Sequence, residues 1–344
     1  MKKSSRTVLV AGIAALGMAL GGCSAPSANV PTAVPSSSPV ETAEALEIID
    51  VTYLTSFNTF GRDAYAFVAL EKGYFEEAGF NVEIQPGTGT VDVLKLVASG
   101  QADFGVGDFQ AAALTIANEG FPVRIVSVIH DKSLAAIATA EGYGIASPKD
   151  LEGKIIADMP GSVNEVLFPV YAEAAGIDAS KVEFIAAAPP ALPQLLASKQ
   201  VDAIGQFVVA DGLIRAATGA AGVFLPFSDY LKNLYGNALL VSEDTLAADP
   251  DMVVRFNEAL HRGLAYSIEN PDETGEILVK YQPTQNAEVA AGEVRAMAPY
   301  VGDASANGVL DENRVESILS LLFEGGAIKS KPVVNDIVNL SLVK

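Results

Sequence analysis

The chain has 344 residues, half of them hydrophobic, and its 42 acidic residues outnumber 22 basic ones to give a formal net charge of −20. An acidic surface is repelled by nucleic-acid phosphates and by anionic lipids, so both are excluded as partners. Cys23 is the only cysteine, which excludes an internal disulfide and a thiolate metal site. His130 and His261 have no carboxylate pattern around them that resembles a ligand set, so no metal or cofactor is expected.

The first 22 residues are typical of a secretory signal. Basic residues within the first six positions precede an uncharged stretch over 8–20, which is too short to span a bilayer. The Leu20-Gly21-Gly22-Cys23 sequence that comes next resembles the lipobox of bacterial lipoproteins, in which the cysteine is diacylated. We therefore expect acyl chains on Cys23 to hold the protein on the extracytoplasmic face of the cell membrane. The alternative is a plain signal peptide with an incidental cysteine.

Residues 23–45 differ in composition from the rest of the chain. They are rich in Ser, Pro, Ala and Thr and contain no aromatic residue, so they bury too little apolar surface to fold. This stretch is predicted to be a flexible tether. The folded part then starts near residue 46, and its roughly 300 residues suit two lobes better than one small core.

Strand and helix patterns alternate from residue 46 onward. Runs rich in β-formers predict strands, and apolar residues at helical spacing predict helices between them. The expected strands are 48–54, 81–84, 102–106 and 123–129, and the expected helices are 65–78, 91–98 and 109–117. Such alternation with short connections is typical of α/β proteins with mostly parallel sheets flanked by helices.

An internal repeat divides the α/β part. Residues 96–103, LVASGQAD, are echoed by residues 195–202, LLASKQVD, and each copy ends a helix and opens a buried strand. We therefore expect two similar lobes, over 46–138 and 143–232. From residue 237 the chain has one more strand at 238–242 and then helices at 250–268, 272–281, 286–299 and 311–323. This part is expected to return to lobe 1, so that lobe 1 comprises 46–138 plus 237–344 and two crossings make a hinge.

Five segments, in order, resemble one family. Residues 70–83, 98–105, 148–154, 200–203 and 250–271 are similar to segments of solute-binding proteins of ABC importers. The group resembled handles the thiamine pyrimidine precursor, riboflavin, sulfonates, taurine and nitrate, and it is related to fungal thiamine-pyrimidine synthases. The resemblance implies a two-lobed periplasmic-binding-protein-like (type II) fold, and a permease with its ATPase as partner. We expect a monomer.

The loop after the first strand holds the first candidate site. Three aromatic residues and an Arg/Asp pair lie within nine positions, at the predicted mouth of the cleft, where aromatic rings can stack on a flat ligand. The candidate ligand-binding residues here are Phe57, Asn58, Phe60, Arg62, Asp63 and Tyr65. Asp63 has an alternative role as the cap of a helix that begins at Ala64.

Two small-residue loops precede helices at matching places in the two lobes. Each is expected to present free backbone N–H groups and a hydroxyl at a helix N-terminus, which suits an anion or a polar ring edge. The candidates are Gly87, Thr88, Gly89 and Thr90 in lobe 1, and Gly161, Ser162, Val163 and Asn164 in lobe 2. The alternative is ordinary capping, in which Thr90 and Ser162 serve only their own helices.

Strand ends supply the remaining candidates. Asp108 and Phe109 come after the third strand, and Gln206 and Phe207 stand at the equivalent place in lobe 2. Asp108 is placed to accept hydrogen bonds from a ligand amino group, or else it caps the next helix; the two phenylalanines are expected to close on a ring from opposite sides. His130 is interpreted as a packing residue and His261 as solvated surface.

No nucleophile–base pair, carboxylate pair or metal set stands at a persuasive spacing, so no enzyme is predicted. The resemblance adds that the fungal synthases use a cysteine-rich segment and a histidine, whereas this chain has one cysteine. The preferred ligand is a nitrogen heterocycle such as a thiamine pyrimidine precursor. The alternatives are an organic sulfonate, taurine or nitrate held by Arg62 and the helix N-termini, a sensor role, and an enzyme of thiamine pyrimidine synthesis.

Overall fold

The computed structural model describes residues 47–343. The predicted signal, Cys23 and the tether lie outside the described residues. Within residues 47–343, none of the helices has the length and apolar character that crossing a membrane requires.

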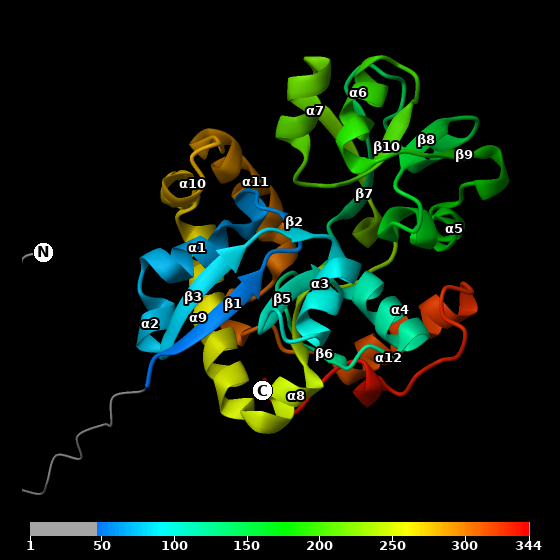
Figure 1. The fold of residues 1–344 in the computed structure, drawn as a ribbon. Coiled ribbons are helices and arrows are strands. Elements are labelled where there is room, and N and C mark those ends of the chain that lie inside the picture. The colour runs from blue at the N-terminus through cyan, green and yellow to red at the C-terminus, as the bar shows by residue number, and fades with distance from the viewer. Residues whose placement is uncertain (1–46, 344) are drawn as a thin grey trace, which may run out of the picture. The chain divides into compact units, whose positions relative to one another are not determined.

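The first sheet has five strands in the order β3-β1-β5-β12-β6 (Figure 1). β1 is parallel to β3 and β5, whereas β12 runs antiparallel to β5 and β6. The carboxyl ends of β1, β5 and β6 and the amino end of β12 therefore meet at one edge. The strands are β1 (Ile49–Leu54), β3 (Phe80–Gln85), β5 (Phe104–Asp108), β6 (Val123–Val128) and β12 (Asn237–Ser242); β2 (Phe57–Asn58) and β4 (Gly87–Thr88) form a short separate pair.

The second sheet has the order β11-β7-β10-β8-β9, and β7 runs antiparallel to both of its neighbours. Its strands are β7 (Ala135–Ala140), β8 (Ile155–Asp158), β9 (Glu183–Ala186), β10 (Ala203–Phe207) and β11 (Gly222–Pro226). Both sheets are thus mixed, which confirms the α/β class. The sequence predicts a first lobe that ends at residue 138, but the strand that contains residue 138 pairs within the second sheet.

Helices flank both sheets. The predicted helix at 65–78 is two helices, because Gly73 adopts φ 74° and starts a new turn. The four helices predicted after residue 237 are found within a few residues of their predicted limits, and α8 was not predicted. The helices are α1 (Ala64–Glu71), α2 (Tyr74–Glu77), α3 (Thr90–Ala98), α4 (Phe109–Glu119), α5 (Val163–Ala175), α6 (Leu192–Ala197), α7 (Asp211–Thr218), α8 (Glu243–Ala248), α9 (Pro250–Glu269), α10 (Pro271–Tyr281), α11 (Ala287–Val301) and α12 (Glu312–Glu324).

The C-terminal helices pack on elements of the first sheet, as predicted. α9 and α10 contact α1, and α12 contacts α4. The centre of this packing is Phe256 on α9, whose ring stacks on Phe104 of β5 at 3.9 Å between centroids and on Phe75 of α2 at 5.0 Å. Stacked buried rings of this kind stabilise a core beyond the area that they bury. His261, on the same helix, is 1% exposed, so its prediction as solvated surface was wrong.

The sequence repeat corresponds to a repeated structure. Asp103 accepts a hydrogen bond from the backbone N–H of Thr52 (2.8 Å), and Asp202 accepts one from that of Ile155 (2.9 Å). In both cases the aspartate ties the turn before a strand to the neighbouring parallel strand. The turn residue has positive φ in both copies, 69° at Gly100 and 58° at Lys199.

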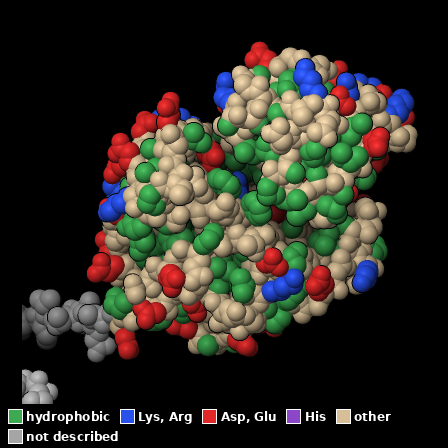
Figure 2. All heavy atoms as spheres, turned by 45° about the horizontal axis from the view of Figure 1, so that its top comes forward, with side chains coloured by type: hydrophobic (Ala, Val, Ile, Leu, Met, Phe, Trp, Pro, Cys, Tyr) green, Lys and Arg blue, Asp and Glu red, His purple; other side chains and the backbone are tan. Residues whose placement is uncertain are grey.

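Two segments join the sheets, residues 129–134 and residues 227–236, and we call them the first and second crossings. They are hydrogen-bonded to each other, from Ser133 N–H to the Leu234 carbonyl and from Gly236 N–H to the His130 carbonyl, both at 2.9 Å. The described surface is hollowed between the parts built on the two sheets (Figure 2). The hinge that the sequence predicts between the lobes would lie in these two crossings.

A candidate ligand site between the two sheets

The strand edge that faces the hollow brings together most of the candidates from lobe 1. Asp108 at the end of β5 stands opposite Asn237 at the start of β12. The Asn237 side-chain amide donates to Ser56 Oγ (3.2 Å), and its backbone N–H donates to His130 Nδ1 (3.3 Å). Ligands of α/β proteins bind outside the carboxyl ends of strands, and this edge is such a place.

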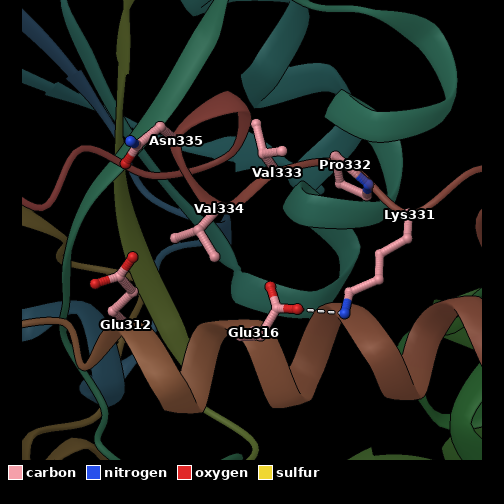
Figure 3. A pocket seen from close by; sticks show the side chains of 7 residues that line it. All are labelled: Glu312, Glu316, Lys331, Pro332, Val333, Val334 and Asn335. Atoms are coloured by element: carbon pink, nitrogen blue, oxygen red, sulfur yellow. Dashed lines mark hydrogen bonds and ion pairs between the residues drawn. The ribbon is translucent and has the colours of Figure 1, made fainter.

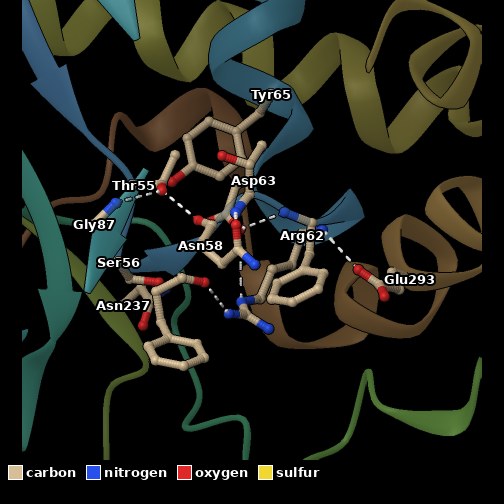
Figure 4. A network of polar contacts seen from close by, with 12 residues as sticks. Thr55, Ser56, Asn58, Arg62, Asp63, Tyr65, Gly87, Asn237 and Glu293 are labelled. Carbon is tan, nitrogen blue, oxygen red and sulfur yellow. Dashed lines mark hydrogen bonds and ion pairs between the residues drawn. The ribbon is translucent and has the colours of Figure 1, made fainter. Parts of the chain in front are cut away.

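We call residues 57–63 the ligand loop, and Arg62 is its central side chain (Figure 4). The Arg62 guanidinium donates to the Phe57 carbonyl (3.1 Å) and lies 3.8 Å from Asp63 Oδ2. Its carbon is 5.0 Å from the ring centre of Phe60 and 5.6 Å from that of Phe207, which ends β10 in the second sheet. Arg62 therefore contacts residues of both sheets.

Two carboxyl groups accompany this arginine. Asp63 accepts from the Phe60 N–H (3.1 Å), and Glu293 of α11 accepts from the Arg62 N–H (3.4 Å). Burial raises the pKa of Asp63 to about 6 and that of Glu293 to about 7, although Arg62 opposes both shifts. Asp63 Oδ1 is buried without a partner. Asp63 caps the short turn that begins at Gly61, not the helix that begins at Ala64.

Asp108 has the capping role that the sequence offered as its alternative. Its Oδ1 accepts from the Ala111 N–H (2.9 Å) at the start of α4. The side chain is nearly buried, and burial raises the pKa of Asp108 to about 7. Thr90 does not cap its own helix; its hydroxyl accepts from the Asp108 N–H (3.0 Å) and so connects the two candidate segments. Asn58 and Thr88 are exposed beside them.

His130 is fully buried, in agreement with a packing role. Its Nδ1 accepts from Asn237, so its proton is on Nε2, which has no partner. Burial, reinforced by the nearby charge of Arg62, lowers the pKa of His130 to about 3. The ring is therefore a neutral donor at neutral pH.

In the second sheet, β8 ends at Asp158, which the sequence analysis did not single out. Asp158 accepts from Ser162 Oγ and from the Met159 N–H (2.7 Å), and burial raises its pKa to about 6. Gly205 makes room for this carboxylate, because a Cβ at that position would overlap it. Asn164 is buried, with Nδ2 3.4 Å from the Gln206 carbonyl and with Oδ1 unpaired. Val163, Gln206 and Phe207 are partly exposed.

The two small-residue loops offer fewer free N–H groups than the sequence predicts. The N–H groups of Gly87 and Gly89 donate to Thr55 Oγ1 and to the Ser56 carbonyl, at 3.1 Å each. In the other loop the Gly161 N–H donates to Glu165, and the Ser162 N–H donates to the Met159 carbonyl. Ser162 also caps α5. Most of the expected anion donors are therefore already engaged.

Two of the aromatic candidates contribute no surface to the hollow. Tyr65 is fully buried and its hydroxyl contacts that of Tyr53 at 3.2 Å. Phe109 is fully buried against Tyr235, with 5.2 Å between ring centres. Phe109 and Phe207 therefore do not close on a ring from opposite sides. Phe57, in contrast, is 38% exposed.

Two shallow pockets lie away from this site. One, of about 430 Å³, is lined by residues 331–335 with Glu312 and Glu316 of α12, and a Lys331–Glu316 ion pair crosses it (Figure 3). The other, of about 310 Å³, lies between the second crossing and α12. Neither is lined by a buried polar group that lacks a partner. Residues 47–343 contain no cluster of three or more His, Cys, Asp or Glu side chains suited to a metal.

Comparison with known proteins gives the family. Residues 63–274 match the family model described as NMT1/THI5 like, which is more than half of the chain. The chain belongs to this family. Over 266 residues it is 27% identical to the riboflavin-binding protein RibY of Chloroflexus aurantiacus, covering 76% of this chain and 74% of the relative. Over 247 residues it is 25% identical to a formylaminopyrimidine-binding protein of Halalkalibacterium halodurans, covering 71% and 73%.

Two of the relatives are named as enzymes. The chain is 23% identical over 277 residues to the 4-amino-5-hydroxymethyl-2-methylpyrimidine phosphate synthase of Schizosaccharomyces pombe, covering 77% of this chain and 79% of the relative. Among solved structures, the aliphatic sulphonate binding protein SsuA of Escherichia coli has a TM-score of 0.70 at 14% identity, covering 86% of this chain and 94% of that protein. At this identity the similarity shows a periplasmic-binding-protein fold alone.

Proposed function

We propose that this protein captures a small nitrogen heterocycle, neutral or cationic, as the solute-binding protein of an ABC importer. The observation that carries the proposal is the charge balance around Arg62, which already has the Phe57 carbonyl, Asp63 and Glu293 beside it. Asp108 adds a further carboxyl at the same strand edge. Aromatic rings beside unpaired acceptors suit stacking and recognition of an amino group.

An anionic ligand is favoured less by the same geometry. The N-terminal turn of α3 carries Asp92, which accepts from Thr88 Oγ1 (3.0 Å), and the Glu165 carboxylate receives the Gly161 N–H at the start of α5. Each carboxylate already occupies the positive end of its helix. A sulfonate, taurine or nitrate would have to compete with these groups, so it stays the second candidate.

The names of two relatives support a heterocycle, since one is a riboflavin-binding and one a formylaminopyrimidine-binding protein. Most of the named relatives are binding proteins, and we propose that this chain is one also and not a pyrimidine synthase. We further propose that Cys23 anchors it by lipid outside the cytoplasm, that a permease with its ATPase receives the solute, and that the protein is a monomer.

The test is calorimetric titration of the purified protein with riboflavin, with 4-amino-5-hydroxymethyl-2-methylpyrimidine and with taurine, after mass spectrometry of co-purifying small molecules. Asp108→Asn keeps an N-cap but removes the carboxylate, and we expect it to weaken heterocycle binding about tenfold or more. Asp249→Asn is the matched control, because Asp249 caps α9 in the same way, through the Met252 N–H (2.9 Å), away from the site. Tight taurine binding without heterocycle binding would contradict the proposal.

A further inference from the structure

The Arg62 side chain fills the aromatic part of the candidate site. Its guanidinium carbon lies within 5.6 Å of the ring centres of Phe60 and Phe207, and its Nη2 donates to the Phe57 carbonyl. The side chain is only 11% exposed. These three phenylalanines are among the aromatic residues that the sequence analysis assigns to contact with a ligand ring. The space beside them is therefore already occupied by a flat group of the protein itself.

A guanidinium and an aminopyrimidine share the features that such a space recognises. Both are planar and delocalised, both present N–H donors along an edge, and both stack on aromatic faces. For Arg62 those donors meet the Phe57 carbonyl and face the Asp63 carboxylate at 3.8 Å. We propose that Arg62 is an internal stand-in for the ligand: its guanidinium occupies the stacking position until an amino-substituted heterocycle displaces it. This inference rests on the proposed function.

Displacement fits the surroundings better than stacking of the ligand on top of the guanidinium. A side chain that is 11% exposed leaves almost no free face for a second ring. The backbone is held in place, because the Arg62 N–H donates to Glu293 and a Cβ at Gly61 would overlap the backbone of Ala290. The long side chain, in contrast, has rotatable bonds that let its cationic end swing out to water. Ligand exchange then requires movement of one side chain and not of the loop.

The stand-in sets selectivity as well as affinity. A ligand that must displace Arg62 binds more weakly than it would to a site without it, because the apparent Kd is the intrinsic Kd divided by the fraction of time that the space is free. A sulfonate would instead form an ion pair with the Arg62 guanidinium, so its binding does not require the guanidinium to leave. Removal of the guanidinium should therefore strengthen heterocycle binding about five- to tenfold and weaken sulfonate binding.

The experiment is calorimetric titration of Arg62→Met and Arg62→Lys with 4-amino-5-hydroxymethyl-2-methylpyrimidine, riboflavin and taurine. Methionine keeps an apolar stem, and lysine keeps the charge beside Asp63 and Glu293 but lacks the flat face. Arg255→Met is the matched control. Arg255 also lies over a phenylalanine ring, that of Phe80 at 4.9 Å, and also donates to a backbone carbonyl, that of Ala78, but within the first sheet's own packing.

We expect both Arg62 variants to bind the pyrimidine more tightly than the unaltered protein, with Arg255→Met unchanged, and circular dichroism melts to confirm that all are folded. Equal or weaker pyrimidine binding by both Arg62 variants would overturn the stand-in and leave the proposed function intact. Failure of the unaltered protein to bind either heterocycle would overturn the proposed function and this inference together. The two failures are thus separated by the titration of the unaltered protein.

Discussion

Arg314 at the start of α12 holds the two crossings together. Its Nη1 pairs with Asp131 Oδ1 at 2.7 Å and its Nη2 donates to the Asp131 carbonyl, both on the first crossing. On the second crossing its Nε donates to the Asn233 carbonyl (2.8 Å) and its Nη2 to that of Leu234 (3.3 Å). The guanidinium also stacks on Tyr235, 3.7 Å from the ring centre.

The magnitude of the clamp can be worked out from these contacts. Hydrogen bonds from a charged donor to the crossing carbonyls contribute about 1 kcal/mol each, and the stacked ring contributes about 1 kcal/mol. The pair with Asp131 adds little, about 0.5 kcal/mol, because the Asp131 side chain is 44% exposed and water screens it. Arg314→Met should therefore lower the free energy of unfolding by about 4.5 kcal/mol.

Urea denaturation followed by far-ultraviolet circular dichroism measures this loss. Arg295→Met is the control, since Arg295 pairs with Asp272 at 2.6 Å on the surface, with side chains 50% and 82% exposed, and should cost about 0.5 kcal/mol or less. If the two variants lose equal stability, or if Arg314→Met loses less than about 1 kcal/mol, then the contacts of Arg314 do not hold the crossings and the reasoning is refuted.

Two further predictions concern local strain and pH. Lys199 has φ 58°, a strained backbone angle for a residue with a side chain, and its ammonium group lies 4.8 Å from the ring centre of Tyr143, a contact that partly offsets the strain. Lys199→Gly should therefore raise the free energy of unfolding by about 0.5 kcal/mol. Gly100→Ala should lower it by about 1 kcal/mol, because Gly100 has a similar positive φ. Urea denaturation of the two variants measures both changes, and a loss of stability in Lys199→Gly would contradict the strain. Burial raises the pKa of Asp108 from 3.8 to about 7, so the folded state holds a proton that the unfolded state releases, and the stability that Asp108 contributes falls as pH rises through this window. Asp108→Asn should therefore gain stability relative to the unaltered protein between pH 4 and about 8, and thermal melts that run parallel over this range would exclude the shift.

Much of the fold could be predicted from the sequence because its signals are local. The helix over 109–117 was predicted from the spacing of its apolar residues, and the structure has α4 over the same residues and two more, closed by Gly120. The turns at Gly100 and Lys199 were recognised as copies because each carries the same Ser, Gln and Asp. The antiparallel direction of β7 and β12 has no local signal, since it depends on how the chain returns between the sheets.

Some residues of the candidate site could likewise be predicted from local sequence signals, and others could not. Arg62 and Asp63 were candidates because they form an Arg/Asp pair among aromatic residues in the loop after the first strand, and Asp108 was one because it ends a strand. Tyr65 and Phe109 come from the same two segments but are buried in the core, because α1 and α4 bury the faces on which these residues lie. Glu293 could not be found, as it lies 231 positions from its partner Arg62 on a helix with no site motif. Asp158 could have been found, because it ends a strand immediately before the Pro160-Gly161 loop.

The C-terminal helices explain why the chain returns to the first sheet after completing the second. α11 holds the ligand loop, through Glu293 and through Gln285 just before it, whose Nε2 donates to the Thr59 carbonyl (2.8 Å). The same helix contacts α7 beside the second sheet. α12 holds both crossings through Arg314. One continuous C-terminal segment thus contacts the ligand loop, both crossings and α7, and within it Glu293 accepts from the backbone N–H of Arg62.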